Sequence, residues 1–118
     1  MRTYLFRGKA LDGEWKFGSL VVLSDEAIII NETGQTKVDP KTVGEWTGLF
    51  DRESNRIFEG DIITACEWFI APYRCVIEFR NGSFVGISSE RTGGGNTYPS
   101  ITQWSEFYSV IGNIHDKR

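Results

Sequence analysis

Four carboxylates in the middle of the chain are the residues best suited to chemistry: Asp51, Glu53, Glu59 and Asp61. Facing carboxylates can hold a divalent cation or act together as a general acid and a general base. All four, however, fall at predicted turns, where Asp and Glu are solvated and accept hydrogen bonds from backbone amides. We therefore expect a structural role for them. An enzyme that uses these carboxylates ranks third among the functional hypotheses.

Three other features each lack a residue that their chemistry needs. Gly93-Gly94-Gly95-Asn96 is rich in glycine, but a phosphate-binding loop also needs a Gly-Lys-Ser/Thr step that opens a helix. His115 is the single histidine, and no nucleophile motif accompanies it. Cys66 and Cys75 are too few for a zinc site, and we expect them to be unbonded, with residue 66 opposite residue 75. The sequence thus predicts no catalytic residue, no metal and no cofactor.

The segment Trp68-Phe69-Ile70-Ala71-Pro72-Tyr73 is the most suggestive candidate for binding. Its proline lacks a backbone donor and resists a place in a central strand, so the segment should turn or lie on a sheet edge. Aromatic rings in a turn either cover the core or contact a partner. We expect them to cover the core, with self-association as the leading functional alternative. The candidate binding residues are Trp68, Phe69 and Tyr73, together with Arg91 and Tyr98 beside the glycine-rich loop.

Short strands must position these residues, because helical periodicity is nearly absent and 13 glycines separate short apolar segments. The firmest local prediction is a hairpin at Asn81-Gly82, since both residues accept the left-handed conformation of a type I′ turn. A two-residue loop sets Phe79 opposite Phe84. We expect these two rings to share a face and to be buried together.

The fold class predicted from this pattern is mainly β, or at most a β-rich α+β fold. Short N-terminal strands should pack on a small SH3-like, strongly bent barrel that begins near residue 43. The chain of 118 residues suits a single domain over residues 1–118, with a subdivision near residue 43 as the alternative. The expected core residues are Trp46, Leu49, Phe58, Ile62 and Ile111, while residues 51–55 should form an exposed turn.

Composition narrows the functional classes. Apolar residues make up 40% and charged residues 25% of the chain, which excludes a disordered protein. The basic N-terminal segment has no apolar stretch behind it, and no apolar run could span a bilayer. We therefore expect a cytoplasmic protein that does not bind a membrane.

Charge bears on nucleic-acid binding. The net charge is −3, and the acidic residues concentrate in the middle of the chain, so tight binding to phosphates is not expected. Small β-barrels can nevertheless present aromatic and basic groups to single strands. Nucleic-acid binding is therefore the alternative function. The structural feature that would support it is a cluster of basic residues beside exposed rings, made of Arg2, Arg7, Lys9 and Lys16. A second cluster, of Arg74, Arg80 and Arg91, would serve equally.

Residues 40–63 carry a Thr42-Val43 step, Trp46-Thr47-Gly48-Leu49, Asp51 in a turn, and Ile57-Phe58-Glu59-Gly60-Asp61-Ile62. This order resembles the signature of the YopX family. Phe6-Arg7-Gly8-Lys9 looks like the opening motif of that family, and Val110-Ile111-Gly112-Asn113-Ile114-His115 looks like its closing motif. One departure is Ser54-Asn55-Arg56, where the family usually has Asn-Gly-Lys. Asn tolerates the left-handed conformation, so we expect the turn to survive.

The resemblance implies an origin in a bacteriophage, a prophage or a bacterium that carries one. It also implies a compact β-rich fold with a small barrel in the second half. The family is generally described as uncharacterised, so the resemblance supplies no reaction. We therefore expect a phage-associated accessory protein that acts as a non-catalytic protein-interaction module in the host cytoplasm. Its partner would be an unknown protein or a second copy of the chain.

Overall fold

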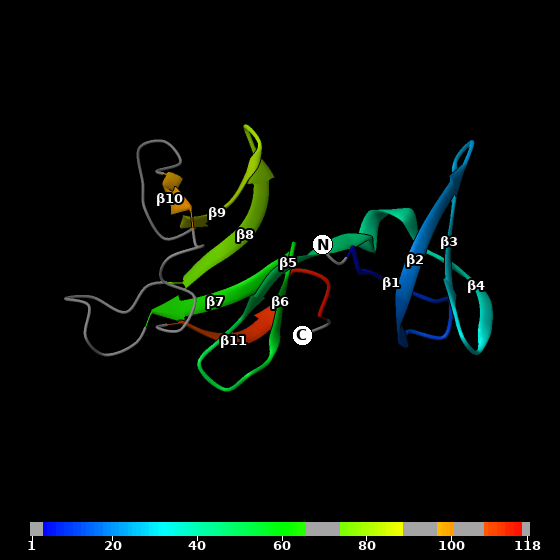
Figure 1. The fold of residues 1–118 in the computed structure, drawn as a ribbon, viewed down its shortest axis with the longest axis horizontal. Helices are drawn as coiled ribbons and strands as arrows, with labels where there is room; N and C mark the ends of the chain where they lie inside the picture. The colour runs from blue at the N-terminus through cyan, green and yellow to red at the C-terminus, as the bar shows by residue number, and fades with distance from the viewer. Residues whose placement is uncertain (1–3, 66–73, 89–96, 101–107, 117–118) are drawn as a thin grey trace. The chain divides into compact units, whose positions relative to one another are not determined.

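The structure is a computed structural model that describes residues 4–65, 74–88, 97–100 and 108–116. Over these residues the chain forms antiparallel β-strands and one short 3-10 helix (Figure 1), so the mainly β class is confirmed. The chain divides into two compact units, Met1–Trp46 and Thr47–Arg118. No helix in the described ranges is long and apolar enough to cross a membrane.

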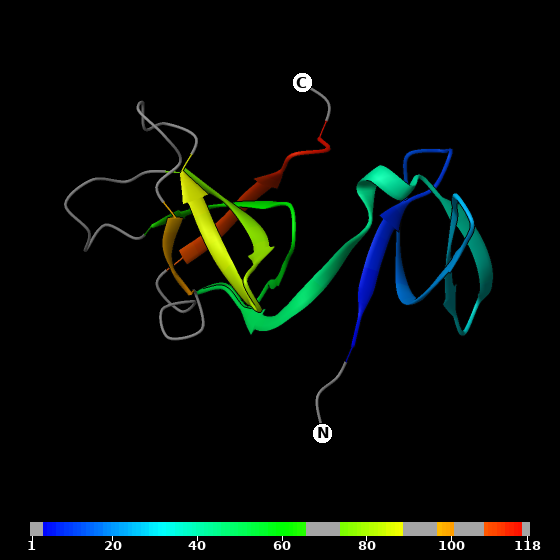
Figure 2. The same cartoon turned by 90° about the horizontal axis from the view of Figure 1, so that it is seen from above.

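The first unit is a curled antiparallel sheet. Its elements are β1 (Phe6–Lys9), β2 (Trp15–Leu23), β3 (Glu26–Asn31), β4 (Gly34–Val38), the 3-10 helix η1 (Pro40–Thr42) and the start of β5 (Gly44–Phe50). These strands lie in the order β4-β3-β2-β1-β5, and the sheet continues with a sixth strand, β6 (Arg56–Phe58), which belongs to the second unit. An isolated bridge between Ala10 and Val38 joins the end of β1 to the end of β4. The sheet therefore rolls around its own inner face, as Figure 2 shows from above.

Alternate residues of these strands fill the inner face. The buried core consists of Ala27, Ile29 and Val38, and Phe6, Leu20 and Val43 pack against it. Gly8 lies on the same face as Phe6, two residues further along β1. A Cβ atom at Gly8 would lie 2.7 Å from Cγ2 of Val38. The close approach of β1 to Val38 therefore requires a residue without a side chain at position 8.

The second unit contains the end of β5 and six further strands. They are β6 (Arg56–Phe58), β7 (Asp61–Ala65), β8 (Arg74–Arg80), β9 (Ser83–Ser88), β10 (Thr97–Ser100) and β11 (Tyr108–Asn113). Five of them form a sheet in the order β10-β9-β8-β7-β11, with register shifts in β10 and β11. Among the described strands, β10 and β11 are the two edges of this sheet and do not pair with each other. The expected barrel is thus a β-rich but open sheet.

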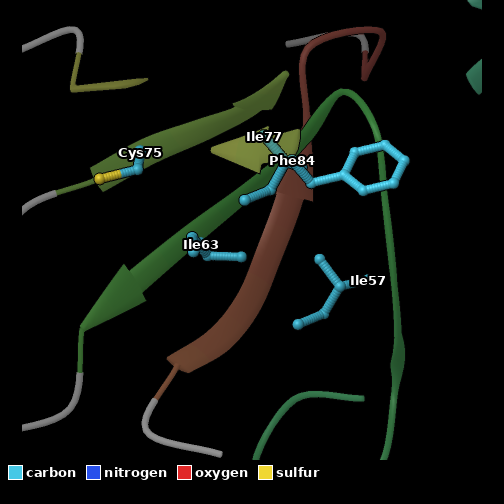
Figure 3. Packing of buried hydrophobic residues seen from close by; sticks show 5 residues of the cluster. All are labelled: Ile57, Ile63, Cys75, Ile77 and Phe84. Carbon is cyan, nitrogen blue, oxygen red and sulfur yellow. The ribbon is translucent and has the colours of Figure 1, made fainter. Parts of the chain in front are cut away.

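The core of the second unit lies on one face of this sheet. Figure 3 shows its buried side chains, which are Ile57, Ile63, Cys75, Ile77 and Phe84. Leu49, Tyr108 and Val110 pack against them and are partly buried.

The hairpin prediction is confirmed in its register and only partly in its burial. Arg80 pairs with Ser83 and Phe79 with Phe84, and Asn81 and Gly82 have φ values of 52° and 82°. The two phenyl rings meet edge to face, with their centroids 5.0 Å apart. Phe84 is buried, but Phe79 is 50% exposed, so joint burial was wrong. Phe79 lies next to the Asn81-Gly82 turn, where the sheet ends, and its ring contacts the ring of Phe84.

Two expectations for the core were also wrong. Phe58 is buried as expected, whereas Ile63 rather than Ile62 is the fully buried residue of β7. Ile111 is exposed, because the register shift between Val110 and Gly112 breaks the alternation of β11 at this residue. Leu49, Trp46 and Ile62 are half-buried.

The expected opposition of the two cysteines is wrong as well. Cys75 pairs with Ile63 of β7 and with Ser88 of β9, and its side chain is buried. The pairing of β7 with β8 therefore places residue 63, and not residue 66, opposite residue 75. Cys66 itself lies outside the described residues.

Candidate functional site

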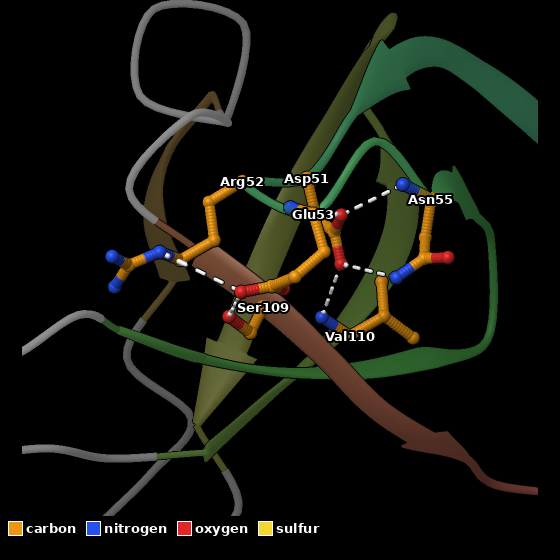
Figure 4. A network of polar contacts seen from close by, with 6 residues as sticks. All are labelled: Asp51, Arg52, Glu53, Asn55, Ser109 and Val110. Atoms are coloured by element: carbon orange, nitrogen blue, oxygen red, sulfur yellow. Dashed lines mark hydrogen bonds and ion pairs between the residues drawn. The ribbon is translucent and has the colours of Figure 1, made fainter.

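The carboxylate of Asp51 is the centre of a polar network in the second unit (Figure 4). Its Oδ1 accepts hydrogen bonds from the backbone N–H groups of Glu53 at 2.9 Å and Asn55 at 2.8 Å. Its Oδ2 accepts from Nδ2 of Asn55 at 3.2 Å and from the backbone N–H of Val110 at 2.9 Å. Residues 52–55 are exposed as expected, but Asp51 is only 5% exposed. The expectation of an exposed turn is therefore wrong for its first residue.

A second set of contacts ties the same turn to β11. The backbone N–H of Arg52 donates to the carbonyl of Tyr108 at 2.9 Å. Ser109 Oγ donates to Glu53 Oε2 at 3.2 Å, and this oxygen lies 3.6 Å from Nε of Arg52. We call this turn (residues 51–55), with its bonds to residues 108–110, the Asp51 clasp. It satisfies backbone groups on β11, an edge strand of the sheet, that would otherwise be open to another strand.

The environment of Asp51 fixes its charge state. Burial of the side chain raises its pKa, but hydrogen bonds from Val110, Asn55 and Glu53 favour the ionised form more strongly, so the pKa lies below its usual value. The group is thus a carboxylate at neutral pH. A general acid needs the opposite shift, toward the working pH. The site is built to accept hydrogen bonds and not to donate a proton.

Asp61 also binds the backbone. It is almost completely buried, and its Oδ2 accepts a hydrogen bond from the N–H of Phe58 at 2.7 Å. Between them Gly60 has a φ of 90°, donates its N–H to the carbonyl of Ile77 and accepts from the N–H of Ile114. Asp61 therefore closes the turn between β6 and β7. Glu59 is half-buried in the same turn.

The four carboxylates do not converge on a common point. Asp51 and Glu53 face β11, whereas Asp61 closes the turn at the start of β7. In the described part of the chain, no three His, Cys, Asp or Glu side chains gather closely enough to hold a metal ion. What the arrangement does is hold three backbone segments in place.

A basic and aromatic cluster lies on the first unit. The guanidinium of Arg7 is 4.4 Å from the ring centroid of Trp15, and Nζ of Lys9 is 5.4 Å from it. The β1–β2 register places Arg7 opposite Phe17 and Lys9 opposite Trp15, so all four residues share one face. Cation–π attraction to the indole ring stabilises the positions of both cations.

This cluster is smaller than the one that the sequence suggested. Lys16 alternates to the other face of β2, and its Nζ lies 3.6 Å from Oε2 of Glu14. Arg2 lies outside the described residues. Sequence reasoning missed Trp15 and Phe17, although their alternation with Lys16 was the signal that could have placed them beside Arg7 and Lys9.

The face of β2 and β3 that points away from the core was also missed. Phe17, Val21 and Leu23 of β2 share it with Ile28 and Ile30 of β3, as the register requires. Phe17 is 43% and Leu23 is 55% exposed. We call these five residues the outer face of the first unit. These five residues are apolar and only Ser19, opposite Ile30, interrupts them on β2, whereas the free face of an antiparallel sheet is commonly polar.

Most of the candidate binding residues from the sequence fall in segments that the structure does not describe. Trp68, Phe69, Tyr73 and Arg91 lie outside the described residues, and Tyr98 belongs to β10, where only the backbone is described. Of the second basic cluster, Arg80 forms an ion pair with Glu78 at 3.0 Å. Arg74 belongs to β8, and the structure describes only its backbone.

Two antiparallel sheets, with buried acidic side chains bound to backbone amides, define a mainly β protein in which the acidic segment is part of the architecture. Residues 15–117 match the family model described as "YopX protein". The match covers most of the chain, so the chain belongs to the YopX family. A search of curated proteins found no match. The matched region contains both parts of the Asp51 clasp, the turn at residues 51–55 and residues 108–110 of β11.

Proposed function

We propose that this chain is a non-catalytic protein-interaction module, encoded by a phage or prophage and active in the cytoplasm of the bacterial host. One observation carries the proposal: two of the carboxylates that could support catalysis, Asp51 and Asp61, are buried and bound to backbone N–H groups. The phage origin is supported by membership of the YopX family.

Exposed apolar side chains support binding to a protein. Phe17 and Leu23 extend from the outer face of the first unit, and both are large hydrophobic residues with more than a third of their surface exposed. Contiguous apolar surface with a polar border is typical of protein-interaction sites.

Site-specific photo-crosslinking tests this proposal. A p-benzoylphenylalanine residue replaces Phe17, and in a control chain it replaces Leu11, which is 93% exposed in the turn after β1. Irradiation of bacteria that carry the protein should give a discrete protein adduct from position 17 and none of the same mass from position 11. Equal adducts from both positions, or no adduct from position 17, would contradict an interaction through this face.

Nucleic-acid binding is the second candidate, and the contacts of Arg7 and Lys9 with Trp15 favour it. It ranks second because Arg7 is buried and the chain carries a net charge of −3. We expect no sub-micromolar complex in fluorescence anisotropy with labelled single- or double-stranded oligonucleotides near ~150 mM salt, where weak non-specific contacts are lost. A salt-sensitive, sub-micromolar complex that Lys9→Ala weakens would reverse the ranking.

A further inference from the structure

Both faces of the β2–β3 pair are apolar. Leu20, Ala27 and Ile29 belong to the inner face, which forms the core, while Val21 and Ile28 point outward. Residues 27–30 are thus apolar without a break. Such uninterrupted runs are typical of strands that are covered on both faces, whereas a strand with one solvated face alternates. The sequence of β3 therefore suits a strand whose outer face is also covered.

The register shows how the outer face is arranged. Val21 lies opposite Ile28, and Ile28 lies opposite Lys37 of β4. In the next row toward the β2–β3 turn, Leu23 lies opposite Glu26. Lys37 Nζ and Glu26 Oε2 form an ion pair at 2.6 Å, and both side chains are about half exposed. The Val21–Ile28 pair thus has the ion pair of Glu26 and Lys37 on the side of the turn, and the next outer row on its other side holds Ser19, Ile30 and Gln35.

We propose that the outer face of the first unit docks on the same face of a second copy of this chain. This inference rests on the proposed interaction function and names the partner. A twofold interface sets the same patch against itself, so a patch with a single sign of charge would repel its copy. The outer face instead carries Glu26 and Lys37 side by side, and each copy presents both signs to the other.

The same charges disfavour other occupants. A nucleic acid or an anionic membrane needs unneutralised cations. Lys37 is already engaged by Glu26, with Asp25 adding a further negative charge, while Arg7 and Lys9 at the Phe17 end lie over the ring of Trp15. A strongly basic partner would be repelled by the positive charge of Lys37. A surface with both signs, such as a second copy, suits this border best.

The size of the face predicts a weak dimer. Strands lie about 4.8 Å apart and rise about 3.3 Å per residue, so an outer face of two to three strands is small beside the roughly 800 Å² per partner of a standard stable interface. We therefore expect a dissociation constant on the order of 10 μM or weaker, as is typical of transient contacts.

Sedimentation equilibrium of the full chain over a wide range of concentrations tests the inference. The wild-type chain should shift reversibly from monomer to dimer. Ile28→Glu places a carboxylate in the centre of the face, directly opposite Lys37, where a cross-strand charge pair preserves the fold. It should weaken dimerisation at least tenfold, and Val21→Lys should do the same from the neighbouring strand. Leu11→Glu is the matched control in the same unit and should leave the dimer unchanged.

The outcomes separate this inference from the proposed function. A wild-type chain that stays monomeric at the highest concentrations overturns the inference, and so does a dimer that both outer-face variants leave intact while circular dichroism shows them folded. In either case, a crosslink from position 17 to a different protein would still support an interaction module. If the wild-type chain forms no dimer and position 17 gives no crosslink, both proposals are contradicted.

Discussion

Replacing Asp51 with alanine should destabilise the second unit by about 2–4 kcal/mol, because a buried charged acceptor of several hydrogen bonds is lost. The variant leaves the N–H of Val110 without its carboxylate partner and removes the bonds that shape the turn at Glu53 and Asn55. Glu53→Ala is the matched control. Glu53 is exposed and makes only a long ion pair and one side-chain hydrogen bond, so its loss should cost at most about 1 kcal/mol.

Urea unfolding monitored by hydrogen exchange at β7, β8 and β11 would measure both changes, since these strands report on the second unit alone. The pH dependence adds a second readout. The pKa of Asp51 is lowered in the folded chain, so its contribution is present above the unfolded pKa of about 3.9 and is lost as the pH falls through the lower folded value. The difference in the free energy of unfolding between wild type and Asp51→Ala should therefore become smaller below about pH 4. Equal stability of the two proteins at pH 7 would show that the clasp is not structural.

Gly8→Ala should destabilise the first unit by about 1–3 kcal/mol, the usual cost of overpacking a filled core. The added methyl group would lie 2.7 Å from Cγ2 and 3.0 Å from Cβ of Val38, which is buried and packs with Ala27 and Ile29. Either β1 or Val38 must move. Hydrogen exchange of β2 and β3 would measure the change in the first unit.

A double-mutant cycle identifies the cause. Val38→Ala removes both Cγ atoms that the added methyl group at position 8 would meet, and it has its own cavity cost. If the contact with Val38 is the reason, the double variant should be more stable than the sum of the two single changes predicts, by about 1 kcal/mol or more. Additive effects would mean that the contacts with the two Cγ atoms of Val38 are not the cause.

The parts of the fold that sequence reasoning predicted correctly are those set by neighbouring residues. The register of the β8–β9 hairpin follows from Asn81-Gly82 alone, because a two-residue turn fixes which residues oppose each other. Phe58 was also predicted to be a core residue, and it is buried. The mainly β class follows from the spacing of glycines along the chain.

The errors concern contacts between residues that are far apart in the sequence. From the sequence, Asp51 resembles a solvated turn residue. Its neighbours do not indicate that the N–H of Val110, 59 positions away, donates to its carboxylate. Ile62 and Ile63 are identical and adjacent, so only the pairing with β8 decides which one faces the core. The bulge that exposes Ile111 likewise depends on the pairing of β11 with β7.

The place of β11 at the edge of the second sheet has a consequence for synthesis on the ribosome. The strands that form the first unit are complete once residue 46 has been made, whereas β7 lacks one of its two partner strands until β11, which ends at Asn113, emerges. At about 5–20 residues per second, the interval between the end of β7 at Ala65 and the end of β11 at Asn113 lasts roughly 2–10 s. During it, one side of β7 is open to a strand from any neighbouring nascent chain. Pausing of translation between these points should therefore promote co-aggregation of unfinished chains, while the first unit folds undisturbed.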